Sequence, residues 1–491
     1  MGTRLFVTME LGPSGFALPR SHLDGSARKA AHGSLQSRDC SAYNRQMPRA
    51  RYKNVVDRLA GDIRSARLAP GTKLPTHREL AADEGLALAT ASRVYAELAA
   101  MGLVSGETGR GTFVRETFLP PGTGMDQHAP ALDLVDLNFN APSLGGQDEL
   151  LRRALRNLSS QGDLEALLRY QPHGGRRHER GAVARHLRRH GVPATSDRVL
   201  IVSGAQHGLA VTAIALLQPG DVVAIDALSY PGFKMVARAH SLELAPIPIT
   251  SDGPDLGALA RLCATRRVRA IYTMPTLHNP LGWVTTLEVR LQLVEIARAY
   301  GLHIIEDATY AFLAEGAPEP LAALAPELTV YVSTLSKSVA TGLRFGFVAA
   351  PSVSVPLIER AIRATTWNTP ALVTAIASEW LDDGTVARLE EKKRADARRR
   401  QSVAREVFEG IDVVGHPTSY ILWIPLTGEA RADRIAAELM HQNVSVSTAE
   451  PFATTQDIPH AVRVAVGSVD LDVLRAALCK VAQVVREHTV L

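Results

Sequence analysis

The sequence contains little cysteine and no long apolar run, and each absence excludes a class of protein. Its three cysteines, Cys40, Cys263 and Cys479, lie far apart and form no CxxC pair. This spacing argues against a disulfide framework or a zinc site and is typical of a reducing compartment. No apolar stretch reaches the ~18 residues that a membrane span needs, and the first residues lack the apolar core of a signal peptide. We therefore expect a cytoplasmic protein with no membrane association and no metal.

The composition is that of a globular chain, and its positive charge is concentrated at the front. Hydrophobic residues make up 46% and charged residues 21% of the 491 residues, which excludes a mostly disordered protein. A chain of this length should form more than one domain, at roughly 100–200 residues per domain. Residues 1–120 carry a net charge of +6, whereas the remaining residues carry −2. A basic front favours contact with a polyanion.

Two segments have the composition of disordered or linking sequence. Residues 1–46 are rich in Ser, Gly, Arg and His and hold no persistent apolar period, so we expect a disordered extension. Residues 117–133 are rich in Pro and Gly and have few large apolar side chains, so we expect a linker. These segments delimit a first domain at residues 47–116 and a second at residues 134–491.

The pattern of the first domain predicts a winged helix-turn-helix. Apolar residues recur every four positions over 51–68, which predicts an amphipathic helix. Thr76 and Glu79 have capping-box spacing, so a second helix should begin at Thr76. A third helix over about 89–101 and two short strands around a Gly-rich turn follow. In this layout the third helix enters the major groove of double-stranded DNA and the wing lies along the backbone.

The same stretch resembles the GntR family of bacterial regulators. The blocks APGTKLPTHRELA, TASRVYAELAAMGLV and GRGTFV match the family in order and spacing over about residues 50–115. The chain departs from many members at Ala87 and Leu88, where they have Ser-Arg, so an operator sequence cannot be transferred. The resemblance implies phosphate contacts for Arg78 and Arg110, and positions on or beside the reading helix for Thr90 and Arg93.

From about residue 134, apolar strands alternate with amphipathic helices. This alternation predicts an α/β domain with a mostly parallel sheet covered by helices, and ligands of such sheets lie beyond the carboxyl ends of the strands. We expect a large part over about 165–360 and a smaller α+β subdomain over about 361–491. The predicted strands are residues 198–204, 222–226, 244–249, 270–274, 303–307 and 330–334.

Polar residues follow these strands, and their chemistry suits pyridoxal 5′-phosphate (PLP). Lys337 supplies an amine that can form a Schiff base with the cofactor aldehyde. Asp307, at the end of a hydrophobic strand, can keep the ring nitrogen protonated. Arg344 can clamp the phosphate, and the turn at Ala205 opens a helix whose N-terminus attracts anions. Asn279 follows another strand and can present its amide to the ring.

The order and spacing of these residues resemble fold-type I aminotransferases along nearly all of residues 135–485. The blocks are SGAQHGL, SYPGF, TMPTLHNPLGWVT, IIEDATYAFL, STLSKSVATGLRFGF and AVRVAVG. The resemblance implies that Lys337 carries PLP and that Arg463 binds the carboxylate of an amino-acid ligand. It places Tyr170 at the phosphate of a neighbouring subunit, which implies a homodimer. The other cofactor contacts that it implies are Ala205, Gln206, Tyr230, Asn279, Asp307, Tyr310, Thr334, Ser336 and Arg344.

A winged helix ahead of an aminotransferase-like domain is the architecture of the MocR subgroup of the GntR family, which this chain resembles. The resemblance implies a PLP-dependent regulator whose binding to promoter DNA is modulated by an amino-containing effector or by PLP itself. An active aminotransferase with an appended DNA-binding domain is the alternative, because the residues for transamination are all present. A regulator that has lost the cofactor is disfavoured by the intact set of Lys337, Asp307 and Arg344.

Some conspicuous residues are given structural interpretations. The run EEKKRADARRR at residues 390–400 has mixed charges in a long predicted helix, which indicates a solvated face. His207 and His278 are interpreted as incidental to the site. Cys263 and Cys479 are interpreted as buried small hydrophobic residues.

Overall fold

The computed structural model describes residues 51–489, apart from 65–66, 69–71, 102, 108–110, 115–133, 162–163 and 429. The predictions for residues 1–46, for the linker at 117–133 and for Arg110 fall outside the described residues.

The first domain has the predicted order of three helices and a hairpin. Helix α2 begins after Thr76, whose hydroxyl accepts from the Glu79 amide while the Glu79 carboxylate accepts from the Thr76 amide, as a capping box requires. The helix ends at Gly85, whose φ of 58° is left-handed and suits glycine. The elements are α1 (Arg51–Arg64), α2 (His77–Glu84), α3 (Leu88–Ala100) and the antiparallel strands β1 (Val104–Glu107) and β2 (Gly111–Val114).

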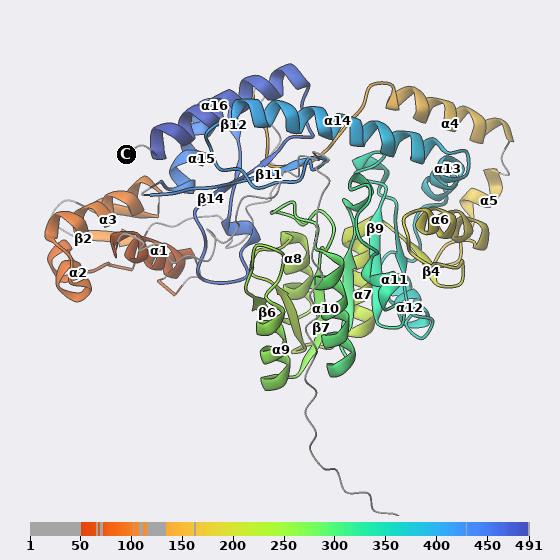
Figure 1. The fold of residues 1–491 in the computed structure, drawn as a ribbon, viewed down its shortest axis with the longest axis horizontal. Helices are drawn as coiled ribbons and strands as arrows, with labels where there is room; N and C mark the ends of the chain where they lie inside the picture. The colour runs from red at the N-terminus through yellow and green to blue at the C-terminus, as the bar shows by residue number, and fades with distance from the viewer. Residues whose placement is uncertain are drawn as a thin grey trace, which may run out of the picture. The chain divides into compact units, whose positions relative to one another are not determined.

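A seven-stranded sheet forms the centre of the second domain (Figure 1). Its order is β4-β10-β9-β8-β7-β5-β6, and every pair is parallel except those that β10 makes with β4 and β9. The six predicted strands are present with ends shifted by at most two residues, whereas the short β10 was not predicted. The strands are β4 (Val199–Val202), β5 (Val222–Asp226), β6 (Glu243–Ile247), β7 (Val268–Thr273), β8 (His303–Asp307), β9 (Thr329–Thr334) and β10 (Gly346–Ala349).

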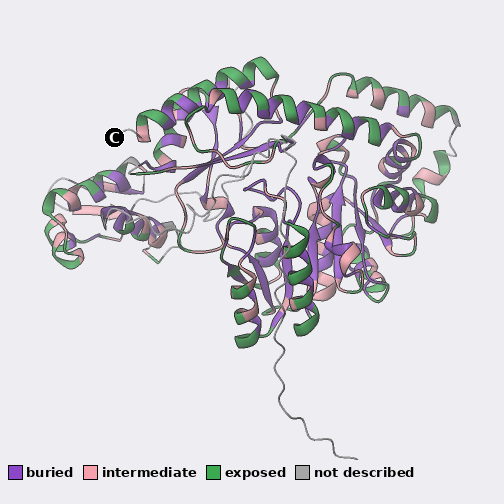
Figure 2. Cartoon of the chain, viewed as in Figure 1, coloured by how far each residue is buried: buried purple, intermediate pink, exposed green. Residues whose placement is uncertain are grey.

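Helices cover both faces of this sheet because side chains alternate along each strand. Leu200 and Val202 pack with α7, α8 and α12 on one face, whereas Val199 and Ile201 pack with α6 and α13 on the other. Figure 2 shows buried strands under helices whose outer faces are exposed. The helices are α4 (Gln147–Gln161), α5 (Leu164–Leu168), α6 (Arg177–Arg189), α7 (Ala205–Leu216), α8 (Pro231–Ala239), α9 (Leu256–Thr265), α10 (Leu287–Tyr300), α11 (Leu321–Leu324), α12 (Val355–Thr365), α13 (Ala371–Asp382) and α14 (Thr385–Val407).

The C-terminal part is a smaller α+β unit, and the start of the domain joins it. Strand β3 (Val135–Asp136) pairs in parallel with β12 (Val444–Ser445), about 300 residues later in the chain. Among the described helices, none has both the length and the apolar character that crossing a membrane takes. The remaining elements are the antiparallel strands β11 (Ile421–Pro425), β13 (Ser447–Thr448) and β14 (Ala461–Ala465), with helices α15 (Ala432–His441) and α16 (Leu471–Thr489).

Two of the structural interpretations are wrong. The charged run on α14 is not simply a solvated face, because Glu390, Lys393, Asp396 and Arg400 are all buried. They recur at three- and four-residue spacing on one side of the helix, and Arg400 donates to Asp396 over 2.8 Å. Cys479 is exposed on α16 rather than buried, although Cys263 is buried as expected.

Candidate cofactor site

Asp307 lies at the carboxyl end of β8 and is almost fully buried. Its Oδ1 accepts from the amide and the hydroxyl of Thr309, and its Oδ2 accepts from the Tyr272 hydroxyl over 2.9 Å. Burial raises the pKa of this carboxyl, and the hydrogen bonds from Thr309 and Tyr272 oppose the rise. The carboxylate is therefore held in one orientation at the edge where ligands of such sheets bind.

Lys337 follows β9 and is half-buried. Its Nζ donates to the backbone oxygen of Asn140 and lies 5.9 Å from the centre of the Tyr310 ring. Tyr310 itself follows Asp307 by three residues and is buried. The amine and the carboxylate thus lie at the ends of two neighbouring parallel strands, on the same edge of the sheet.

The turn between β4 and α7 forms an open anion cradle. Gly204, with a φ of 90°, precedes Ala205 and Gln206 at the N-terminus of α7. A side chain at Gly204 would come within 2.8 Å of the Arg344 guanidinium, and the φ of 90° would strain any other residue, so glycine lets Arg344 approach this turn. The exposed Arg344 reaches this turn, where its Nη2 donates to the Ser203 carbonyl over 3.4 Å.

Two hydroxyls complete this side of the site. The side chains of Thr334 and Ser336 are buried, and their oxygens lie 2.9 Å apart. Thr334 is the last residue of β9 and its hydroxyl also donates to the Phe345 carbonyl over 2.7 Å, while Ser336 directly precedes Lys337. Backbone amides at a helix N-terminus, an arginine and hydroxyls are a donor set that suits phosphate.

Tyr230 connects several of these groups. Its hydroxyl donates to Gln206 Oε1 over 3.3 Å. Burial raises the pKa of Tyr230, and the charges of Asp307 and Tyr310 add to the rise, while Arg344 and Arg463 oppose it. Five of the predicted residues therefore lie close enough to interact electrostatically.

Arg463, on β14, is buried and interacts electrostatically with Tyr230 and Tyr310. Its Nη1 donates to the Asn138 carbonyl, while its Nε is buried without a hydrogen-bond partner among the described residues. Burial lowers the pKa of this guanidinium. A buried donor of this kind is available to an anionic ligand.

The other predicted residues make no contact with the candidate cofactor site among the described residues. Tyr170 is 87% exposed, and its ring contacts that of Trp367 at 5.6 Å between centres. In the first domain, Arg78 is exposed on α2 and Thr90 is half-buried on α3. Arg93, also on α3, is exposed with its guanidinium 4.4 Å from the centre of the Tyr52 ring.

The residues present fit PLP. Asn279 Oδ1 is buried without a hydrogen-bond partner in the described part of the chain, which is costly unless a ligand group satisfies the amide. The Gly204 cradle supplies backbone amides and Arg344 as donors for a phosphate, and Asp307 and Lys337 supply a carboxylate and an amine. Each polar feature of the cofactor therefore has a side chain of suitable chemistry.

Sequence reasoning missed three contributors. Tyr272 lies in the predicted strand over 270–274 and was given no role, but its hydroxyl donates to Asp307. Asn140 accepts from Lys337, a pairing between residues almost 200 positions apart that no local pattern predicts. His278, interpreted as incidental, is fully buried, its Nε2 lies 3.3 Å from Asp226 Oδ2, and it interacts electrostatically with Asp307.

Comparison with known proteins identifies two parts of the chain. Residues 51–114 match the family of bacterial regulatory proteins called gntR, and residues 133–481 match aminotransferase class I and II. The chain belongs to the MocR subgroup of the GntR family. YdeF of Bacillus subtilis, named an uncharacterized HTH-type transcriptional regulator, is 30% identical to this MocR-type chain over 419 residues, which is 84% of this chain and 90% of YdeF.

Two further proteins are similar to the second domain of the MocR-type chain. A 2-aminoadipate transaminase of Thermus thermophilus is 27% identical over 340 residues, covering 67% of this chain and 84% of the transaminase. The solved structure of LysN, an α-aminoadipate aminotransferase of Thermus thermophilus, superposes with a TM-score of 0.67 at 22% identity, covering 72% of this chain and 93% of LysN. At that identity, the likeness to LysN establishes the fold.

Proposed function

We propose that this MocR-type chain is a transcriptional regulator that binds promoter DNA through residues 51–114 and holds PLP at Lys337. In this proposal an amino-containing effector, or PLP itself, changes its affinity for DNA. The observation that carries the proposal is the convergence of Lys337, Asp307 and the Gly204 cradle in a chain that also has a winged helix. The relative YdeF carries the name of an uncharacterized HTH-type transcriptional regulator and matches 84% of this chain, which supports the same conclusion.

The donor set supports PLP over other phosphate-bearing ligands. Lys337 would bind the aldehyde, Asp307 would hold a proton at the ring nitrogen, and Arg344 with the N-terminus of α7 would bind the phosphate. When bound, PLP supplies an aldehyde that can exchange one amine for another. LysN was solved in complex with N-(5′-phosphopyridoxyl)-L-leucine, which supports a cofactor of this class in the fold.

The hydrogen bonds of the segment Asn138–Asn140 suggest how an effector could change the structure. Lys337 donates to the Asn140 carbonyl and Arg463 donates to the Asn138 carbonyl. An amino acid that engages both side chains would compete with both hydrogen bonds. The same segment is tied to the small subdomain, because Asn138 donates to Ser445 Oγ over 2.7 Å.

This segment also follows directly on the part of the chain that leads from the DNA-binding domain. A ligand that binds one arrangement of the segment more tightly than another would shift the population of DNA-binding states. The change in DNA affinity cannot exceed the difference in effector affinity between those states. Tyr170, 87% exposed, supports a homodimer in which it reaches a second copy.

Fluorescence anisotropy with the DNA upstream of the chain's own gene tests this function. The PLP-loaded chain is titrated with DNA in the presence and absence of each of a panel of amino acids. We expect one amino compound, or PLP loading itself, to change the dissociation constant at least roughly 5-fold. Lys337→Ala should bind the same DNA without that response; an equal response in Lys337→Ala would contradict the proposal.

The active-aminotransferase alternative has a different outcome in the same preparation. Steady-state assays with amino donors and oxo-acid acceptors measure turnover directly. Rapid and specific turnover without DNA binding would favour the enzyme. Specific DNA binding with an effector response and little turnover would favour the regulator.

A further inference from the structure

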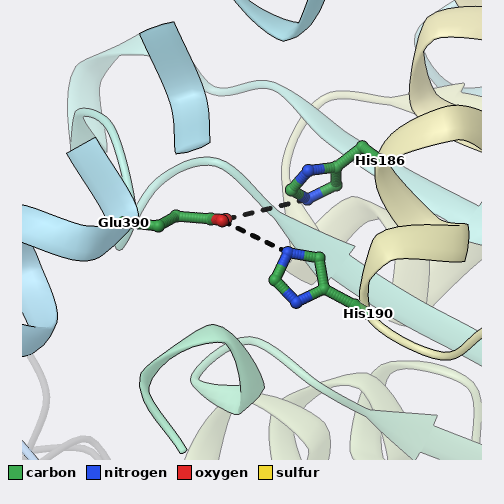
Figure 3. Close-up of side chains that lie close together, drawn as sticks. All are labelled: His186, His190 and Glu390. Atoms are coloured by element: carbon green, nitrogen blue, oxygen red, sulfur yellow. Dashed lines mark hydrogen bonds and ion pairs between the residues drawn. The ribbon is translucent and has the colours of Figure 1, made fainter. Parts of the chain in front are cut away.

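A cluster of three potential metal ligands lies outside the cofactor site (Figure 3). His186 and His190 are one helical turn apart at the end of α6, and Glu390 comes from α14. Glu390 Oε2 lies 3.2 Å from His190 Nε2, and Glu390 Oε1 lies 3.7 Å from His186 Nε2. All three ligand atoms are within 4.8 Å of one another, and in Figure 3 both rings point toward the carboxylate.

The cluster is buried, and its chemistry suits a cation. Glu390 and His186 are more than nine-tenths buried, while His190 is about a quarter exposed. The ion-pair partners of Glu390 among the described residues are these two histidines.

The residues around the cluster leave a small space. A cavity of about 10 Å³ is lined by all three side chains, which is room for about one water-sized body. The Phe347 ring packs edge-on against His186 at 5.8 Å between centres and fixes its orientation. The hydroxyl-bearing Ser333 and Thr334 also line this cavity, so a fourth ligand or a bound water has polar neighbours.

We propose that His186, His190 and Glu390 bind a divalent transition-metal ion of the zinc class. Zinc–nitrogen and zinc–oxygen distances of about 2.0–2.1 Å place neighbouring ligand atoms of a tetrahedron about 3.4 Å apart. The two carboxylate–histidine distances, 3.2 Å to Oε2 and 3.7 Å to Oε1, are close to that value, although they end on different oxygens of Glu390. Two nitrogens and one oxygen with a fourth position for water suit zinc better than magnesium or calcium, which prefer oxygen ligands.

The proposed ion would join α6 to the first part of α14, which packs in the same core cluster. Helix α6 packs on the central sheet beside β4, whereas the later residues of α14, such as Val403 and Ala404, pack with the small C-terminal unit. The proposed site departs from the sequence-based expectation of no metal. It uses none of the candidate PLP-binding side chains except Thr334 in the lining, so it stands apart from the proposed function.

The competing interpretation is a carboxylate that simply accepts hydrogen bonds from two imidazoles. The stoichiometry of bound metal distinguishes the two interpretations.

In the experiment, the full-length chain is treated with a chelator, titrated with Zn²⁺ and separately with Co²⁺, and freed of loose metal by gel filtration. Bound metal is counted by mass spectrometry, and the visible spectrum of the Co²⁺ form reports its coordination. Variants His190→Gln and Glu390→Gln remove one ligand each, and His178→Gln removes an exposed histidine of the same helix.

We expect the number of bound ions per chain to be higher by one in the wild type and His178→Gln than in His190→Gln or Glu390→Gln. The affinity of either ligand variant for Zn²⁺ should fall at least roughly 10-fold, and the intense visible absorption of four-coordinate Co²⁺ should disappear. Far-ultraviolet circular dichroism checks that each variant is folded. Equal stoichiometry in wild type and His190→Gln, with both folded, would overturn the metal site and leave the hydrogen-bonded cluster.

Discussion

The Tyr272 hydroxyl donates a 2.9 Å hydrogen bond to Asp307 Oδ2, and both groups are buried in the centre of the large sheet. The Tyr272 ring is itself held by Phe233, stacked at 3.9 Å between centres. A hydrogen bond to an ionised carboxylate favours the charged form. The pair therefore helps to keep Asp307 ionised although burial raises its pKa.

Removing that hydroxyl should weaken PLP binding. Tyr272→Phe keeps the ring packing but loses a charge-assisted hydrogen bond, so we expect the dissociation constant of PLP to rise roughly 10-fold. Asp307→Asn should raise the dissociation constant of PLP further. Equilibrium dialysis measures both, and Tyr420→Phe, which loses a tyrosine–aspartate bond elsewhere, is the matched control. Unchanged PLP affinity in Asp307→Asn would contradict its pairing with the ring nitrogen.

Glu306, the neighbour of Asp307, should make the cofactor-free chain less stable at alkaline pH. Burial raises its pKa from 4.5 to about 7, so between these values the folded chain holds a proton that the unfolded chain has lost. The free energy of unfolding therefore falls as pH rises through that window, by up to about 3 kcal/mol. Glu306→Gln should lack this fall.

Urea unfolding at pH 5 and pH 8 measures this difference. The midpoint of the wild type should drop between the two pH values by more than that of Glu306→Gln. Glu391→Gln, an exposed position of α14, should behave as the wild type. Parallel pH dependence in wild type and Glu306→Gln would show that Glu306 is ionised in the folded chain.

Arg78 should contribute to DNA binding through phosphate rather than through bases. We expect Arg78→Ala to weaken binding to all duplexes alike and to lower the slope of log K against log salt by about 0.9. Anisotropy titrations from low to high salt measure the slope. Arg152→Ala, an exposed arginine of α4, is the control, and an unaltered slope in Arg78→Ala would refute the phosphate contact.

Arg463 should decide whether the chain responds to amino acids. Arg463→Lys keeps the charge but loses the planar pair of donors that fits a carboxylate. We expect it to bind DNA and PLP as the wild type does, while the amino-acid concentration needed for a response rises at least roughly 10-fold. A normal response would assign the effector carboxylate to another group.

Local patterns predicted much of the fold because their causes are local. The capping box at Thr76 and Glu79 lies within four residues, and the strand that ends at Asp307 is apolar because both faces of the sheet are covered. The short β10 escaped prediction because four residues carry little periodicity. Its place between β4 and β9 is set by tertiary pairing.

Contacts between distant segments could not be predicted in this way. Glu390 belongs to a run that has the composition of a solvated helix, and its burial depends on α6, 200 residues earlier. Likewise, Lys337 was conspicuous among small residues, but its acceptor Asn140 was not. The resemblance to known families supplied roles for individual residues, whereas the hydrogen bonds that orient them required the fold.

Covalent attachment of PLP at Lys337 is the claim on which the proposed function depends. The most direct measurement is reduction of the purified chain with borohydride, followed by peptide mass spectrometry. The proposal predicts a phosphopyridoxyl addition on the peptide that contains Lys337, absent from Lys337→Ala. A colourless protein with no such addition, after incubation with excess PLP, would contradict it.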